Sequence, residues 1–258
     1  MTNAVYMEDL FAWDSGITSI PSGLFAGCSK AERFDGCFGS TSITTIPEKL
    51  FYDCINAKNF NATFALTPLI EIPENLFANC PAVKYYTSVF SETQITNIPS
   101  KIFPASTETS VSFGGAFYGC QGITAIPAEL FANVTVGELG NGYNVMVHGC
   151  FESTNIINVP EGIFSTVSKN VSFGRCFKNC KNLISIPQNL VKDDLDKITN
   201  FDEMFMGCIN LTGTVQSYWT RPPVVDSDLN LKFPVHGKKC FNECTKLSNY
   251  ADIPAEWK

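Results

Sequence analysis

Apolar residues follow one recurring pattern, Ile-x-x-Ile-Pro-x-x-Leu-Phe, along most of the chain. It is clearest at residues 17–25 (ITSIPSGLF), 43–51 (ITTIPEKLF) and 123–131 (ITAIPAELF). Further copies lie at residues 69–77, 95–103, 156–164 and 183–191, and degenerate copies follow at 211–219 and near 253–254. The prolines of the first four copies are 26 residues apart. A fixed period of this length predicts a solenoid of stacked coils.

A shorter period lies inside the longer one. An aromatic or large apolar residue, usually Phe, recurs every 13 or 14 residues, at positions 11, 25, 38, 51, 64, 77, 90, 103, 117, 131, 151, 164, 177, 191, 205, 219 and 241. Two intervals are stretched, because Phe131 to Phe151 takes 20 residues and Trp219 to Phe241 takes 22. We expect two halves to make one coil, about nine coils in all, with these side chains stacked along a single axis of one continuous core.

Each coil is predicted to hold a short strand and a short helical turn. The Ile-x-x-Ile segment suits a strand, because β-branched side chains pack well on a pleated surface. Proline ends the strand, since it lacks the N–H for a sheet, and it is tolerated at the first position of a helical turn. The sequence therefore predicts an α/β solenoid of the leucine-rich-repeat type, with right-handed stacked coils in a single domain over residues 1–258.

The two stretched intervals are candidate binding loops, at residues 132–146 and 220–236. Both follow the Leu-Phe half of a coil, so we expect them on the same edge, and insertions on one face of a solenoid often mark its binding face. The alternative is that they are tolerated loops that return into the stack. Each stretched interval returns through Val-His-Gly, at residues 147–149 and 235–237, so the two histidines, His148 and His236, are expected at equivalent loop ends. The candidate partner-binding residues are Glu138, Asn141, Tyr143, Trp219, Arg221, Asp226 and Asp228.

All eleven cysteines occupy two positions of the repeat. They lie either three residues after a repeat Phe (28, 54, 80, 120, 180, 208, 244) or directly before one (37, 150, 176, 240). Thr, Ser or Asp takes the first position in other coils, so the position selects a small side chain, and a free Cys behaves as a small apolar residue. Disulfides and zinc are weaker alternatives, because an odd number in columns does not pair off and ligands spread along an axis do not converge. The cysteines predict packing and maturation in a reducing cytoplasm.

Composition and motifs narrow the function. The net charge is −7 with no basic run, which argues against nucleic acid as a partner. No apolar stretch approaches the roughly 18 to 20 residues of a membrane span, and the first residues lack the features of a signal peptide. Enzyme motifs such as a P-loop or nucleophile elbow are absent, so we expect no catalytic residues, cofactor or metal. Asp226-x-Asp228-x-Asn230 is similar to the start of a calcium loop but lacks its glycine and final acid.

One pattern, Phe-x-x-Cys-x-x-Leu-x-x-Ile-Pro, carries a family resemblance. It is clearest at residues 177–187 (FKNCKNLISIP) and resembles the BspA-like, or Treponema pallidum-type, leucine-rich repeats over nearly the whole chain. The resemblance implies a stacked-coil solenoid without catalytic residues, of a kind associated with adhesion on gut and oral bacteria and found also in phages and protists. This chain departs from the usual pattern in its longer coil and in having no export signal.

Together these features predict a non-enzymatic interaction module with a protein or glycan partner. The favoured reading is a structural or host-recognition component of a larger assembly, such as a bacteriophage virion. The alternative is a bacterial cell-surface adhesin domain. Because solenoid ends expose apolar surface unless they are capped, we expect at least one end to dock against a partner.

Overall fold

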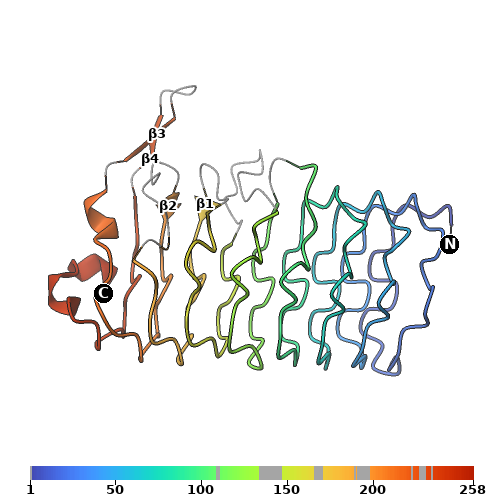
Figure 1. Cartoon of the computed structure of the whole chain (residues 1–258), viewed down its shortest axis with the longest axis horizontal. Coiled ribbons are helices and arrows are strands. Elements are labelled where there is room, and N and C mark those ends of the chain that lie inside the picture. The colour runs from blue at the N-terminus through green and yellow to red at the C-terminus, as the bar shows by residue number, and fades with distance from the viewer. Residues whose placement is uncertain are drawn as a thin grey trace.

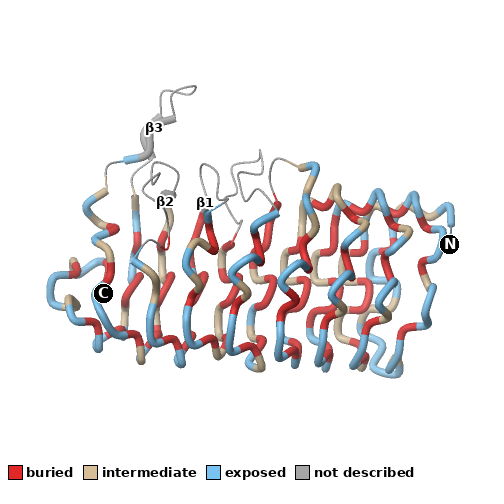
Figure 2. Tube along the Cα trace, viewed as in Figure 1, coloured by how far each residue is buried: buried red, intermediate tan, exposed pale blue. Residues whose placement is uncertain are grey.

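The computed structural model describes residues 2–108, 111–133, 147–165, 171–188, 190, 198–221, 223–226, 231–233 and 235–258. The chain is a solenoid, an elongated stack of coils with the termini at opposite ends (Figure 1). Buried residues line the inside of the stack and exposed residues its outside (Figure 2).

Regular secondary structure is sparse in the described part. The strands are β1 (Val171–Ser172), β2 (Ile198–Asn200), β3 (Val224–Asp226) and β4 (Leu231–Phe233). The 3-10 helices are η2 (Tyr218–Thr220), η3 (Tyr250–Asp252) and η4 (Ala255–Trp257). β1 pairs with β2 in parallel, and β3 pairs with β4 in an antiparallel hairpin.

Three columns of aromatic rings fill the interior. The first column has ring centroids 5.3 to 5.9 Å apart and runs through Phe11, Phe38, Phe64, Phe90, Phe117, Phe151, Phe177, Phe205 and Phe241. The second column includes Phe25, Phe51, Phe77, Phe103, Phe131 and Phe164. The third includes Phe34, Phe60, Tyr86, Phe113, Phe173 and Phe201. Each stacked pair adds about 0.5 to 1.5 kcal/mol to the gain from burial.

The prediction of a single aromatic axis was wrong. Rings one full repeat apart stack in parallel, as Phe38 and Phe64 do at 4°. Rings 13 residues apart, such as Phe51 and Phe64, belong to neighbouring columns and are tilted by 58°. Trp219 was also misassigned, because Tyr218 is the ring that enters the core in η2, with 1% of its surface exposed. The core therefore has a triangular cross-section of rings.

The strands and helical turns of each coil are less regular than predicted. Parallel bridges link Tyr6, Arg33, Asn59, Tyr85 and Ser112, which lie outside the Ile-x-x-Ile segments. Within those segments the described bridges join residues 158 to 185 and 213 to 247. One hydrogen bond between residues three apart closes the proline turn, as where the Leu24 N–H donates to the Pro21 carbonyl at 3.2 Å. The segments are too short for continuous strands, since proline ends each after a few residues.

Backbone hydrogen bonds between coils all run in one sense beside the first column. In the coil of Phe38, the N–H groups of Gly36, Phe38 and Ser40 donate to carbonyls of the next coil at 2.8 to 2.9 Å. The same alternate N–H groups donate toward the C-terminal neighbour in coil after coil. Beside the first column, N–H groups therefore face the C-terminal end of the stack and carbonyl groups its N-terminal end. Elsewhere the sense is reversed, as where the Lys58 N–H donates to the Glu32 carbonyl of the preceding coil at 2.8 Å.

Each coil bends sharply on either side of its first-column Phe. The residues two before and two after this Phe have positive φ, as at Ala62 (50°) and Leu66 (59°). Glycine fills some of these positions, but many hold other residues, and a left-handed conformation costs a non-glycine residue about 1 to 2 kcal/mol. The bends are thus a local strain that stacking of the aromatic core outweighs.

The cysteines are buried, which confirms that their positions serve packing. All eleven are free thiols. Four of them, Cys120, Cys180, Cys208 and Cys244, place Sγ 2.9 to 3.1 Å from the carbonyl of the first-column Phe in the preceding coil. Where Thr takes this position, as at Thr93 and Thr154, its hydroxyl donates to the Phe carbonyl of its own coil at 2.8 to 2.9 Å. The position therefore selects a small side chain that also donates a hydrogen bond.

Candidate binding groove

Two adjoining polar pockets cross four successive coils on one side of the stack. The first, of about 400 Å³, is lined by Glu92, Thr93, Gln94, Tyr118, Gly119, Gln121 and Ser153. The second, of about 350 Å³, is lined by Gln121, Ser153, Thr154, Asn155, Asn179 and Lys181. They share Gln121 and Ser153, and we call them together the polar groove.

The backbone bend of each coil shapes this groove. Glu92, Gly119, Ser153 and Asn179 each lie two residues after a first-column Phe, with φ between 56° and 69°. A Cβ on Gly119 would lie 2.9 Å from Glu92 Cγ, so any other residue here would displace the Glu92 side chain. Beneath them, Thr93 and Thr154 are buried and bonded to the core backbone. The groove therefore rests on a rigid floor.

The groove offers hydrogen-bonding groups rather than charge. Its lining holds four side-chain amides (Gln94, Gln121, Asn155, Asn179) and is charged only at Glu92 and Lys181. Asn155 is fixed by a 2.7 Å bond from Nδ2 to the Gln121 carbonyl. Tyr118 is 37% exposed and supplies an aromatic surface. Such a lining suits a neutral polar ligand that offers both donors and acceptors.

The apolar pattern of the sequence does not predict this groove. The available signal was the polar residue four positions after a first-column Phe, as at Gln94, Gln121 and Asn155. It was missed because the bend two residues after the Phe, which joins these side chains into one channel, is not visible in the apolar pattern.

Most of the sequence-predicted site residues lie outside the described part. These are Glu138, Asn141, Tyr143 and Asp228, together with most of the 132–146 insertion. Asp226 is in β3, where it pairs with Leu231 across a hairpin that projects from the stack (Figure 1). The second insertion thus contains a β-hairpin, which its prolines did not suggest, and the role of Asp226 in binding stays a prediction.

Trp219 and Arg221 pack onto the last coils. The Trp219 ring lies edge-on to Phe241 at 6.5 Å and to Trp257 at 6.0 Å. The Arg221 guanidinium lies 4.7 Å from the centroid of the Tyr218 ring, within reach of a cation–π attraction. Both side chains therefore have a structural role here, and neither lines the polar groove.

The two histidines do not occupy equivalent positions, contrary to the sequence prediction. His148 lies three residues before Phe151, whereas His236 lies five residues before Phe241, because two lysines intervene. His236 Nδ1 is 3.0 Å from Asp202 Oδ1. Burial lowers the pKa of His148, with the nearby Arg175 acting in the same direction. The shared Val-His-Gly tripeptide therefore marks no common site.

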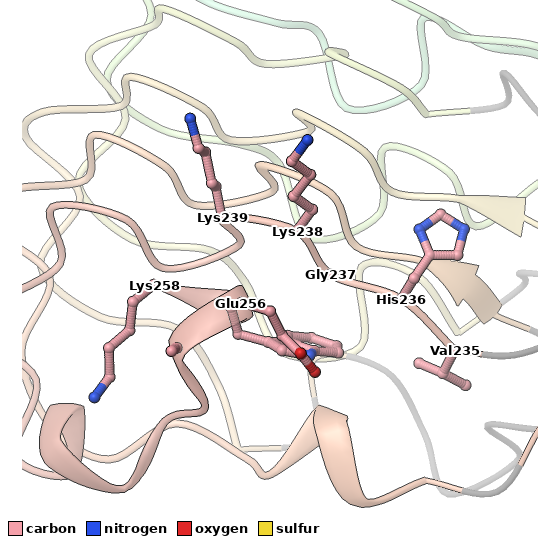
Figure 3. A pocket seen from close by; sticks show the side chains of 9 residues that line it. Val235, His236, Gly237, Lys238, Lys239, Glu256 and Lys258 are labelled. Carbon is pink, nitrogen blue, oxygen red and sulfur yellow. The ribbon is translucent and has the colours of Figure 1, made fainter.

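A third pocket, of about 480 Å³, lies at the C-terminal end (Figure 3). Its lining includes Lys238, Lys239, Lys258 and Glu256. In Figure 3, Lys238 and Lys239 point one way and Lys258 points another, so the three ammonium groups do not converge. The pocket therefore lacks the clustered positive charge of an anion site.

Two further features bear on function. Within the described ranges, no three His, Cys, Asp or Glu side chains gather as metal ligands would. No helix in the part of the chain that the structure describes has the length and hydropathy needed to cross a bilayer.

Comparison with known proteins places the repeat in a family. Residues 9–135 match the BspA type leucine rich repeat region in six copies. No curated protein matches the chain. A leucine-rich repeat protein of Leptospira interrogans shares 14% identity and a TM-score of 0.42 over 76% of this chain and 45% of its own. A leucine-rich repeat protein of Bacteroides ovatus shares 16% identity and a TM-score of 0.33 over 90% and 69%.

This chain thus spans less than half the length of the Leptospira protein. The six matched copies lie in the part of the stack where the first and third aromatic columns are continuous from coil to coil. Over residues 9–135, the chain belongs to the BspA type leucine-rich repeat family.

Proposed function

We propose that this protein is a non-enzymatic recognition module whose polar groove binds a neutral polar surface on a partner. Leucine-rich repeats are protein-interaction modules, and the proposal assigns that role here to one defined surface. The groove carries it, because four amides and an exposed Tyr118 are held on a rigid floor across several coils. A protein loop or a glycan offers the matching donors and acceptors.

The extent of the domain and the number and handedness of its coils are part of the same proposal. We take residues 1–258 as one domain of about nine right-handed coils, each relying on its neighbours for burial. The continuity of the first column from Phe11 to Phe241 supports this count. The insertions at 132–146 and 220–236 remain candidate loops for further partner contacts.

The favoured setting is a structural or host-recognition component of a larger assembly, such as a bacteriophage virion. Eleven free, buried thiols support assembly in a reducing compartment, where disulfides do not form. The alternative, a bacterial cell-surface adhesin domain binding host protein or glycan, is supported by the association of the repeat family with adhesion. A virion component copurifies with particle proteins in fixed stoichiometry. Its presence only on bacterial envelopes would instead favour the adhesin.

Two substitutions in the groove and one control substitution of an exposed tyrosine outside it test the proposal. The full chain is screened on a glycan array and against purified proteins of its native assembly, and the affinity of each hit is measured. Tyr118→Ala and Gln121→Ala are expected to weaken binding at least tenfold, about 1.4 kcal/mol. Tyr52→Ala is the control, since Tyr52 is 57% exposed but lies outside the groove. Unchanged affinity in both groove variants would reject the groove as the binding surface.

A further inference from the structure

The polar groove follows the axis of the stack and is built from the same three positions of each coil. The residues two and four places after a first-column Phe form its walls, and the residue between them, such as Thr154, forms its floor. The first-column rings of these coils, from Phe90 to Phe177, follow one another at 5.9, 5.7 and 5.7 Å. The groove therefore presents one set of wall positions per coil at a nearly constant spacing, which suits a linear polymer better than a single compact ligand.

Most of the polar side chains on these walls are available to a ligand. Within the described part of the chain, no residue bonds to the side-chain ends of Gln94, Gln121 or Ser153. The side-chain amide of Asn179 is likewise without a partner among the described residues. Each amide offers two N–H donors and an acceptor oxygen, so these side chains can meet a hydroxyl group in either orientation.

The chemistry of the lining matches a sugar. Glu92 lies in the first coil of the groove and Lys181 in the last, whereas the lining residues of the two middle coils are uncharged. Tyr118, in the second coil, exposes 37% of its surface at the wall. The face of an aromatic ring carries partial negative charge, which attracts the C–H hydrogens on the flat face of a sugar ring. A neutral ligand with many hydroxyl groups and flat rings therefore fits this lining.

The coil spacing favours a polysaccharide over a polypeptide. An extended polypeptide presents the same side at every second residue, about 6.6 Å along the strand. This repeat exceeds the coil spacing by about 0.8 Å, so a peptide would lose register by about 2.4 Å over the groove. A shift of that size breaks hydrogen bonds. A pyranose ring that is linked through opposite carbons advances its chain by about one coil, so successive rings stay in register with the walls.

We propose that the polar groove binds an extended, neutral polysaccharide whose long axis follows the stack, with about one sugar ring per coil. This ligand class rests on the proposed role of the groove as the binding surface. Tyr118 stacks on the flat face of one ring, and the free amides along the walls bond to the hydroxyl groups of that ring and its neighbours. Glu92 and the net charge of −7 disfavour an acidic polysaccharide.

The dependence of affinity on ligand length tests the proposal. β-(1,4)-linked oligosaccharides of glucose, N-acetylglucosamine and mannose, each with two, four or six rings, are titrated into the full chain by calorimetry. We expect at least one series to bind, with affinity rising at least tenfold from two rings to four and little from four to six, because further rings extend beyond the groove. The β-(1,4)-linked tetramer of mannuronate is the acidic control and should bind at least tenfold more weakly than the best neutral tetramer.

Substitutions of Tyr118 separate ring stacking from other contacts. Tyr118→Ala should weaken binding of the best tetramer at least tenfold, whereas Tyr118→Phe keeps the ring and should bind nearly as well as the unsubstituted chain. Gln121→Ala should also weaken binding, and Tyr52→Ala, outside the groove, should not. No saturation with any neutral series up to about 1 mM, equal affinity for two and four rings, or tighter binding of mannuronate overturns the proposal.

The outcomes also separate the ligand class from the groove itself. If no neutral series binds, but Tyr118→Ala and Gln121→Ala weaken the binding of a protein partner, the polysaccharide is rejected and the groove remains the binding surface. If an oligosaccharide binds both variants as tightly as the unsubstituted chain, the polysaccharide proposal and the groove are rejected together.

Discussion

Replacing Phe64 with alanine tests whether the aromatic columns hold the stack together. Phe64 is fully buried in the first column, 5.6 Å from Phe38 and 5.8 Å from Phe90, with both rings nearly parallel to it. Phe11 belongs to the same column but has a ring neighbour only in Phe38, at 5.3 Å, and is partly exposed. Phe11→Ala is therefore a control with the same chemistry and fewer contacts.

The two substitutions should lower the free energy of unfolding by clearly different amounts. Truncating a buried Phe costs about 3 to 5 kcal/mol. Phe64→Ala should lie in the upper part of that range, because it removes two stacked pairs worth about 0.5 to 1.5 kcal/mol each beyond burial. Phe11→Ala removes one pair and less buried area, so we expect about 1 to 2 kcal/mol.

Urea unfolding followed by circular dichroism measures both free energies of unfolding, with hydrogen exchange locating the damage. Because coils contact only their neighbours, amide protection should fall around Phe38 and Phe90 and stay unchanged near Phe205. A cost for Phe64→Ala no larger than that of Phe11→Ala would refute the reasoning. Uniform loss of protection along the whole chain would refute the nearest-neighbour picture.

Three further predictions follow from the backbone and the thiols. Leu66→Gly should stabilise the protein by about 0.5 to 1 kcal/mol, because it relieves a φ of 59° at an exposed side chain, and a higher urea midpoint would show it. Thr154→Val should cost about 0.5 to 1.5 kcal/mol, because the Phe151 carbonyl loses the hydroxyl donor at 2.8 Å and keeps the Cys180 thiol at 3.1 Å; Thr154→Cys should cost less, and equal costs would contradict the donor role. Burial raises the pKa of Cys80, Cys180 and Cys244 from 9.0 to about 12, so unfolding releases protons in that range. Stability should therefore be intact below pH 9 and fall as pH rises toward 12, and a flat profile over that window in thermal melts would contradict it.

The sequence predicted the class of fold because each repeat carries apolar side chains at the same positions, and stacked coils bury them. The Ile-Pro and Leu-Phe positions mark which side chains face inward, and the inward burial of Phe25 and Phe51 is confirmed. The number of aromatic columns was predicted wrongly, because a 13-residue spacing does not say whether two rings share an axis. Phe34 and Phe60 lie four residues before a first-column Phe, a signal hidden by the stronger period.

The polar groove was harder to predict for a different reason. It depends on left-handed residues such as Glu92 and Ser153, whose side chains give no sign of a positive φ. Glycine is the usual marker of that conformation, and only Gly119 supplies it here. The candidate loops were chosen by length, and Trp219 and Arg221 show that a residue beside an insertion can pack against core rings instead.

The repetition of the same hydrogen bonds between coils has a consequence for how such a gene changes. Beside the first column, the described junctions use equivalent N–H donors of one coil and equivalent carbonyl acceptors of the next. Unequal recombination can therefore add or remove a whole 26-residue unit without altering either terminus of the stack. Length is then a property that natural variation can adjust in steps of one repeat, while the terminal chemistry is inherited unchanged.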